Sequence, residues 1–197
     1  MTAAEHPDAP PAGDIVLHAC CGPCASACVP ALKEAGRRPT MYFANSNIDT
    51  AEEYARRLEA ARTLAAAEGV ELAAEPYDHA DWLEHVARGF EDAPEKGARC
   101  ARCFRYSLEK TAAFAASRGE AAFTSSLTVS PHKVSSMVFA AGEEAARNVG
   151  GSEFLPFDFK KRNGFLRSVA RARELGLYRQ GYCGCEFSRR EAEGRRK

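Results

Sequence analysis

Short apolar runs alternate with helix-type segments along most of this chain, and this alternation restricts the fold more than any other feature. Strands are predicted where the apolar runs fall, at residues 14–19, 40–45, 70–77, 121–130 and 153–159. Helical patterns lie between and after them, at residues 25–36, 50–69, 79–90, 101–119, 132–150 and 164–176. Strands joined through helices form a mainly parallel sheet covered by helices on both faces. The sequence therefore predicts an α/β fold with a C-terminal helical extension.

The helix expected at residues 50–69 has recognisable signals at both ends. Thr50 is a good N-cap residue, and Glu53, three positions later, would complete a capping box. Gly69 is the expected terminating residue, since glycine readily adopts the left-handed conformation that ends helices.

The length of 197 residues and the 45% hydrophobic content suit one folded domain. We expect a disordered leader at residues 1–13, a single α/β domain at 14–188 and a basic tail at 189–197. No run of about 20 apolar residues is available to cross a membrane. The leader lacks the pattern of an export signal, so the expected compartment is the cytoplasm, where thiols stay reduced.

Eight cysteines are the most informative residues for function. Cys20, Cys21 and Cys24 follow the first predicted strand, at the sheet edge where parallel α/β folds bind ligands. Cys100 and Cys103 form a Cys-x-x-Cys pair at the start of a predicted helix. Cys20 and Cys21 together with this pair supply four thiolates, enough for zinc or an iron–sulfur cluster.

Three interpretations of these cysteines compete. A thioredoxin-like dithiol at Cys21 and Cys24 is disfavoured, because the motif follows the first strand, no Trp precedes it, and a dithiol shuttle has no use for Cys20. A zinc-binding RNA-binding module remains an alternative, although adjacent cysteines are expected to diverge and so to suit a wider cluster better than one ion. An ATP-dependent tRNA-modifying enzyme would need a Gly/Ser-rich phosphate loop where the chain has "CCGPC".

The remaining cysteines have other predicted roles. Cys183 and Cys185 are one residue apart, so a disulfide between them would close a small, strained and easily reduced ring. This spacing favours a redox relay, with further metal ligation as the alternative. Cys28 is expected to pack as a small buried hydrophobic residue.

Charge is distributed unevenly along the chain. Residues 160–197 hold 12 Lys and Arg against 4 Asp and Glu, while the rest holds 15 against 23. A basic C-terminal segment favours a polyanionic partner.

Several long motifs, from about Ile15 to Ser188, resemble the QueH family of epoxyqueuosine reductases, which are independent of cobalamin. The motifs are "LHACCGPC", "FANSNI" followed by "EYARR", "EKGARCARCFRYSLEKTA", "FTSSLTVSPHK", "FLPFDFKKRNGF" and "YRQGYCGCEFS". The resemblance implies a fold like that of the adenine-nucleotide alpha-hydrolases. It also implies two-electron removal of the epoxide oxygen of epoxyqueuosine, at the wobble position of tRNA, as the last step of queuosine biosynthesis.

The same resemblance implies which residues hold the cofactor. The [4Fe–4S] ligands fall on Cys20, Cys21, Cys100 and Cys103, and the redox-active disulfide falls on Cys183 and Cys185. Cys24 is the nearest unassigned thiolate for a second iron beside the cluster. The electron donor is not identified.

Predicted substrate contacts complete the hypothesis. Asn45 and Asn47 follow the second strand, where they either bind substrate or cap the turn into the next helix. The candidate proton donors are Ser125, Ser126 and Tyr182. The basic residues expected to track tRNA phosphates are Lys160, Lys161, Arg162 and Arg167. His18, within a buried strand, is expected to be a core histidine, and Trp82 a core residue.

Overall fold

A computed structural model describes residues 13–195 of the chain, and its centre is a five-stranded sheet. The order across the sheet is β3-β2-β1-β4-β5, and every neighbouring pair is parallel. The strands are β1 (Gly13–His18), β2 (Arg37–Phe43), β3 (Leu72–Ala74), β4 (Ala122–Ser125) and β5 (Glu153–Phe154). The predicted α/β fold is confirmed. The expected leader, apart from Gly13 in β1, lies outside the described residues.

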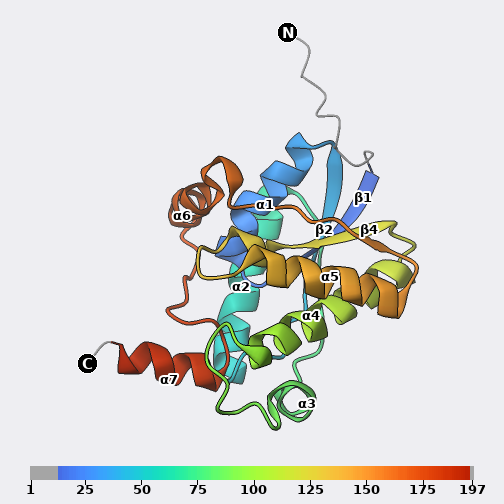
Figure 1. Ribbon diagram of the computed structural model, residues 1–197. Helices are drawn as coiled ribbons and strands as arrows, with labels where there is room; N and C mark the ends of the chain where they lie inside the picture. The colour runs from blue at the N-terminus through green and yellow to red at the C-terminus, as the bar shows by residue number, and fades with distance from the viewer. Residues whose placement is uncertain (1–12, 196–197) are drawn as a thin grey trace.

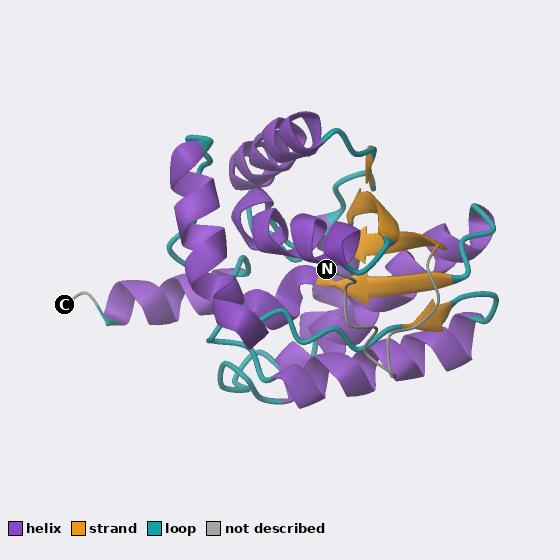
Figure 2. Ribbon diagram, turned by 90° about the horizontal axis from the view of Figure 1, so that it is seen from above, coloured by secondary structure: helices purple, strands orange, loops and turns teal. Residues whose placement is uncertain are grey.

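Helices cover both faces of this sheet (Figures 1 and 2). They are α1 (Gly22–Glu34), α2 (Ala51–Glu68), α3 (His79–Trp82), α4 (Ala98–Ser117), α5 (Ser135–Val149), α6 (Gly164–Glu174) and α7 (Glu186–Gly194). Ile15 and Leu17 of β1 belong to a core shared with α1 and α2, while Val16 belongs to a core shared with α4 and α5. This follows from the two-residue period of a strand, which sends successive side chains to opposite faces.

Several elements are shorter than the sequence pattern predicts. The edge strands β3 and β5 have three and two residues, where runs of eight and seven residues were expected. β4 ends at Ser125 because the Ser125 hydroxyl accepts a hydrogen bond from the Leu127 N–H at 3.2 Å, which starts a 3-10 turn, Ser126–Val129. The helix expected at residues 79–90 is the single turn α3 followed by a π-helical turn, Leu83–Ala87.

Two helix starts matter for the site. α4 begins at Ala98, three residues earlier than expected, so that Cys100 and Cys103 both lie within helix. α7 covers part of the segment expected to be a basic tail. In the part of the chain that the structure describes, no helix combines the length and the apolar character needed to traverse a bilayer.

The caps of α2 are largely as predicted. The Thr50 hydroxyl accepts a hydrogen bond from the Glu53 N–H at 3.1 Å, and Gly69 ends the helix in the left-handed conformation, with φ of 62°. The other half of the capping box does not form. The Glu53 carboxylate instead pairs with Arg57 at 2.7 Å and accepts a hydrogen bond from the Tyr178 hydroxyl at 2.8 Å. Glu53 therefore ties α2 to the segment that precedes Cys183.

Candidate functional site

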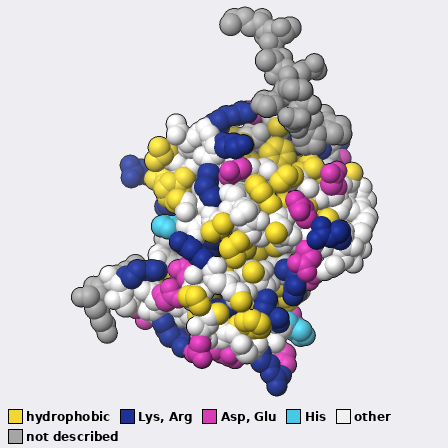
Figure 3. All heavy atoms as spheres, viewed as in Figure 1, with side chains coloured by type: hydrophobic (Ala, Val, Ile, Leu, Met, Phe, Trp, Pro, Cys, Tyr) yellow, Lys and Arg dark blue, Asp and Glu magenta, His cyan; other side chains and the backbone are white. Residues whose placement is uncertain are grey.

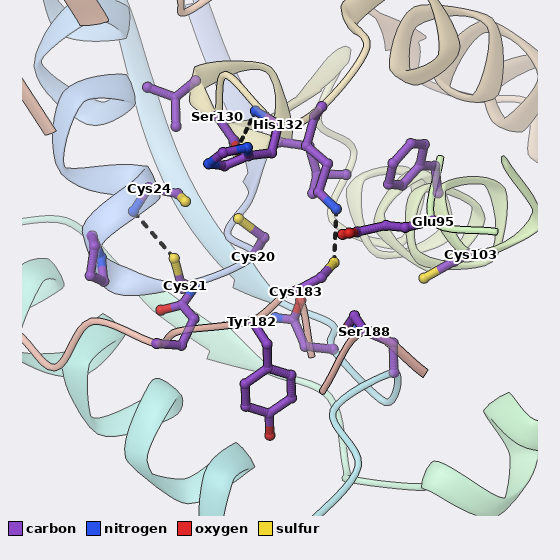
Figure 4. A pocket seen from close by; sticks show the side chains of 18 of the residues that line it. Cys20, Cys21, Cys24, Glu95, Cys103, Ser130, His132, Tyr182, Cys183 and Ser188 are labelled. Carbon is purple, nitrogen blue, oxygen red and sulfur yellow. Dashed lines mark hydrogen bonds between the residues drawn. The ribbon is translucent and has the colours of Figure 1, made fainter. Parts of the chain in front are cut away.

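A cavity of about 530 Å³ opens where β1, β2 and the turn after β4 end. Five cysteines line it: Cys20, Cys21 and Cys24 from the start of α1, Cys103 from α4, and Cys183 from the segment before α7. Figure 4 shows these side chains around a common space. The cavity lies at the carboxyl edge of the sheet, where the sequence predicts a site.

The first three cysteines form a compact group. The sulfur atoms of Cys20, Cys21 and Cys24 lie within 4.8 Å of one another. Thiolates around one tetrahedral ion, each about 2.3 Å from the metal, would be about 3.8 Å apart. The expectation that the adjacent cysteines diverge is therefore wrong, and the group has the spacing that one metal ion requires.

Local hydrogen bonds and tight packing fix this group. Cys21 is the N-cap of α1, and its sulfur accepts a hydrogen bond from the Cys24 N–H at 3.3 Å. The Cys20 sulfur accepts one from the Ser126 hydroxyl at 3.3 Å. Only glycine fits at position 22, because a Cβ there would lie 2.4 Å from the backbone oxygen of Ala60 in α2.

Protons are shared unequally within the group. Hydrogen bonds from Cys20 and Cys24 lower the pKa of the Cys21 thiol well below its ordinary value, and Gln180 contributes to this shift. Hydrogen bonding with Cys20 and Cys21, together with burial, raises the pKa of Cys24. Cys21 is therefore the first of the three to become the thiolate that binds metal.

A second group of cysteines lies around the start of α4. Burial raises the pKa of the Cys103 thiol, and the nearby Cys183 and Cys185 raise it further. Burial also raises the pKa of Cys100, whose sulfur accepts a hydrogen bond from the Lys96 N–H at 3.3 Å. Cys103 lines the cavity together with Cys183 and packs against the hydrophobic cluster that contains Cys185.

Whether these residues fit an iron–sulfur cluster depends on the donor set and the space between the two groups. The donors are all thiolates, the ligands that iron–sulfur clusters take. Cys20, Cys21 and Cys103, three of the four predicted ligands, line the same cavity. Within residues 13–195, only Cys20, Cys21 and Cys24 come within the distance for one shared ion. One ion would not reach from the cysteines at the start of α1 to those at the start of α4. A wider iron–sulfur cluster could join them.

Cys183 and Cys185 are free thiols, so their predicted disulfide remains a prediction. Their loop is held firmly: Arg57, 1% exposed, donates a hydrogen bond to the Cys183 carbonyl oxygen at 2.7 Å. The Asp49 N–H donates one to the carbonyl oxygen of Gly184 at 3.0 Å. Gly184 has φ of 155°, and a Cβ there would lie 2.6 Å from Nδ2 of Asn47.

The predicted substrate contacts fall into three places. Asn45, Asn47 and Tyr182 line the cavity. Ser125 and Ser126 are buried beside it, where Ser125 hydrogen bonds to His18 and Ser126 to Cys20. The basic residues Lys160, Lys161 and Arg162 lie before α6.

Two of these residues are already engaged. The Tyr182 hydroxyl donates to Asp49 at 2.7 Å, and burial together with the Asp49 charge raises its pKa. The Asn45 side chain donates to the Ala19 carbonyl oxygen at 2.9 Å and so anchors the loop that carries the first cysteines.

Three residues expected in the core lie there. His18 is 1% exposed and hydrogen bonds to Ser125 and to the Ala44 carbonyl oxygen, and burial lowers its pKa to about 4. Cys28 is fully buried. Trp82 is 1% exposed, although its indole nitrogen has no hydrogen-bond partner among the described residues.

Sequence reasoning missed Lys133, Arg57 and Gln180 as parts of the site. Lys133 and Gln180 line the cavity, and Arg57 supports the Cys183 loop. The available signal was position: Lys133 and Gln180 lie within "FTSSLTVSPHK" and "YRQGYCGCEFS", and Arg57 ends "EYARR". Their residue types do not distinguish these three residues from the other polar residues of the chain.

A parallel sheet with thiols gathered at its carboxyl edge defines this chain as a cysteine-rich α/β protein suited to metal and redox chemistry. The family model described as "Epoxyqueuosine reductase QueH" matches residues 15–191. The chain therefore belongs to the QueH family of epoxyqueuosine reductases and is an oxidoreductase.

Curated relatives support the same family. The chain is 38% identical to Epoxyqueuosine reductase QueH of Streptococcus pyogenes serotype M1, over 88% of this chain and 69% of that protein. It is 36% identical to the QueH protein of Dehalococcoides mccartyi, over 92% of this chain and 95% of that protein. The QueH protein of Thermotoga maritima is 33% identical, over 89% and 90% respectively.

Proposed function

We propose that this chain removes the epoxide oxygen of epoxyqueuosine in tRNA as water, through a [4Fe–4S] cluster held by Cys20, Cys21, Cys100 and Cys103. The observation that supports this proposal is the thiol-lined cavity, to which sulfurs from α1 and α4 both contribute. When bound, such a cluster supplies electrons to the reaction. The electrons would come from a donor that is not identified, and the reaction would take place in the cytoplasm.

The chain's own residues would position the substrate. Asn45, Asn47 and Tyr182 line the cavity, where an unstacked base could be held by hydrogen bonds and by the face of an aromatic ring. Lys161 and Arg162, both exposed, would contact phosphates of the tRNA. Ser126 would act indirectly, by fixing the Cys20 sulfur.

The proposal also assigns roles to Cys183, Cys185 and Cys24. Cys183 and Cys185 would act as a redox pair that helps to supply electrons or to reset the site. Cys24 would be the ligand of a second iron beside the cluster, since its sulfur lies within 4.8 Å of those of Cys20 and Cys21.

The test is turnover on tRNA that carries epoxyqueuosine, with anaerobically purified protein and dithionite as the reductant. Mass spectrometry of the released nucleosides should show the loss of one oxygen atom. Cys20→Ala should abolish the conversion, whereas Cys28→Ala, a change of a buried cysteine outside the site, should leave most of it. Intact epoxyqueuosine after incubation with protein that holds its cluster would contradict the proposal.

A zinc-binding RNA module is the second candidate, and the single-ion spacing of Cys20, Cys21 and Cys24 favours it. Metal analysis and a visible absorption spectrum of the anaerobic protein separate the two candidates. Iron, sulfide and broad visible absorbance support the reductase, and one zinc ion in a colourless protein supports the module.

A further inference from the structure

Lys133 places a cation beside one of the two thiols of the predicted redox pair. Its Nζ lies 2.8 Å from the Cys183 sulfur, the contact drawn as a dashed line at Cys183 in Figure 4. Both residues line the cavity, although 50 positions separate them in the sequence. A distance of this size is that of a charge-assisted contact.

Both partners are held by their backbones, so the contact does not depend on two free side chains meeting. The Lys133 N–H donates to the Ser130 carbonyl oxygen at 3.2 Å, and the Lys133 carbonyl oxygen accepts from Lys160 Nζ at 2.6 Å. On the other side, Arg57 donates to the Cys183 carbonyl oxygen at 2.7 Å.

The surroundings of Lys133 contain thiols in place of a paired carboxylate. Glu95 and His132 line the same cavity, but the ion pairs of the described residues include none that joins Lys133 to a carboxylate. Burial alone would lower the pKa of Lys133, but the contact with Cys183 outweighs it and raises that pKa. Lys133 therefore stays an ammonium group, and the Cys183 sulfur lies 2.8 Å from its Nζ.

Cys185 has a different environment. It is 9% exposed and lies at the N-terminal end of α7, with its sulfur 3.6 Å from the Ser188 hydroxyl. Burial raises the pKa of its thiol, in spite of the Ser188 hydrogen bonds. The two thiols are thus unequal, since one faces the cavity beside a cation and the other is buried as a neutral group.

We propose that Lys133 is a positioning residue that holds Cys183 as a thiolate, which makes Cys183 the reactive sulfur and Cys185 the sulfur that closes the disulfide. The inference rests on the proposed function of the pair. Joining the Cys183 thiolate to the Cys185 thiol forms one S–S bond, breaks one S–H bond and releases two electrons and one proton. The two electrons enter the reduction of the epoxide, which takes up that proton and a second one from solvent to form water.

The experiment measures alkylation of Cys183 by iodoacetamide at pH 7, in the reduced full chain, with the modified residue identified by mass spectrometry. Because the thiolate is the reactive form, Lys133→Met should slow the reaction at Cys183 by about tenfold or more. Lys133→Arg, which keeps the charge, should stay within about threefold of wild type. Lys33→Met is the matched control, since it removes an exposed lysine of α1 outside the cavity, and the rate at Cys183 should be unchanged.

Wild-type reactivity toward Cys183 in Lys133→Met would overturn the inference. If circular dichroism shows that this variant is unfolded, Lys133→Gln takes its place.

A second measurement uses the unaltered protein and compares the rates of alkylation by iodoacetate, which is anionic, and by iodoacetamide, which is neutral. Because a neighbouring ammonium attracts an anionic reagent, the ratio of the iodoacetate rate to the iodoacetamide rate should be higher at Cys183 than in free glutathione. An equal or lower ratio would overturn the inference. Alkylation needs neither tRNA nor turnover, so its failure is distinguishable from failure of the proposed reaction.

Discussion

Ser126 shows at the scale of single residues how this chain fixes a candidate ligand. Its hydroxyl is fully buried, accepts a hydrogen bond from the Cys20 N–H at 3.0 Å and donates one to the Cys20 sulfur at 3.3 Å. Hydrogen bonds to ligand sulfurs are among the factors that set the potential of iron–sulfur clusters. Ser126 is therefore expected to affect both the placement of Cys20 and the potential of a cluster bound there.

Replacement of Ser126 by Ala should lower the reduction potential of the cluster, because the sulfur would no longer receive a hydrogen bond that stabilises added negative charge. The unpaired Cys20 N–H should also cost about 1–3 kcal/mol of stability. A redox titration followed by visible absorbance checks the first effect, and denaturant unfolding checks the second. Ser152→Ala is the control, because Ser152 is a buried serine outside the cavity whose hydroxyl has no hydrogen-bond partner among the described residues. Equal potentials in Ser126→Ala and wild type would argue against the role.

At the scale of elements, close packing of α1 on α2 positions the first three cysteines. The two helices approach closely at Gly22, one residue after the N-cap cysteine Cys21. A side chain at this position must displace the backbone of α2 or shift the start of α1. Either movement would change the spacing of the sulfur atoms.

Gly22→Ala should therefore destabilise the fold by about 1–3 kcal/mol, as overpacking of a core does. The same change should reduce the metal content of the purified protein. Gly194→Ala is the matched control, since no atom lies within 4 Å of a Cβ at that position. Denaturant unfolding and metal analysis check both effects, and unchanged stability and metal content would show that α1 does not need this approach.

The docking of α7 should depend on pH through His79 and Glu186, whose side chains approach to 3.5 Å. Burial lowers the pKa of His79, but the Glu186 contact outweighs it and raises the value above 6.5. Burial raises the pKa of Glu186, but hydrogen bonding to His79 outweighs it and lowers the value below 4.5. The His79 contribution is complete below 6.5 and disappears as pH rises through its raised pKa. The Glu186 contribution is complete above 4.5 and disappears as pH falls through its lowered pKa.

Amide protection in α7, corrected for intrinsic exchange, should therefore be higher at pH 6 than at pH 8.5. Glu186→Gln should remove most of that difference, because the amide cannot pair with a protonated His79. His85→Gln is a control in an exposed histidine of the neighbouring π-helical turn. The same protection at both pH values in wild type would refute the proposed contact.

The order of strands and helices could be predicted from the sequence because it depends on local apolar periodicity. The lengths of β3 and β5 could not, because an edge strand is limited by the one neighbour with which it pairs. α7 was also missed, since its nine residues contain only one buried side chain, Ser188, and so show little apolar pattern.

At the scale of the whole molecule, the C-terminal basic charge is partly used within the fold. Arg167 pairs with Glu34 at 3.1 Å, Arg171 with Glu68 at 2.9 Å and Arg189 with Asp49 at 2.8 Å. On the face drawn in Figure 3, Lys and Arg are interspersed with Asp and Glu and do not form one patch. The total basic charge of this segment is therefore a poor guide to tRNA contact. Exposed basic residues that are not paired within the fold are better candidates.

Lys161→Gln with Arg162→Gln should weaken tRNA binding and reduce the slope of affinity against salt by about 2, one for each phosphate that the protein no longer neutralises. The cluster content should not change. Arg38→Gln is the control, since Arg38 is an exposed residue that pairs with Asp14 near the opposite edge of the sheet. Binding measured by fluorescence anisotropy over a range of salt tests this, and unchanged affinity in the double variant would place the tRNA elsewhere.

The sequence predicts that Cys20, Cys21 and Cys24 lie together after the first strand, and their sulfur atoms lie within 4.8 Å of one another. It does not show that Cys103 and Cys183 line the same cavity. Contacts such as Lys133 with Cys183 depend on how distant segments meet, which local patterns do not encode.

The most direct test measures iron and acid-labile sulfide per chain in anaerobically reconstituted wild type, Cys103→Ala and Cys28→Ala. If α1 and α4 share one cluster, wild type and Cys28→Ala should hold about four sulfides and at least about four irons per chain, and Cys103→Ala should lose most of both. A Cys103→Ala protein with the full iron and sulfide content would contradict a cluster that joins the two helices.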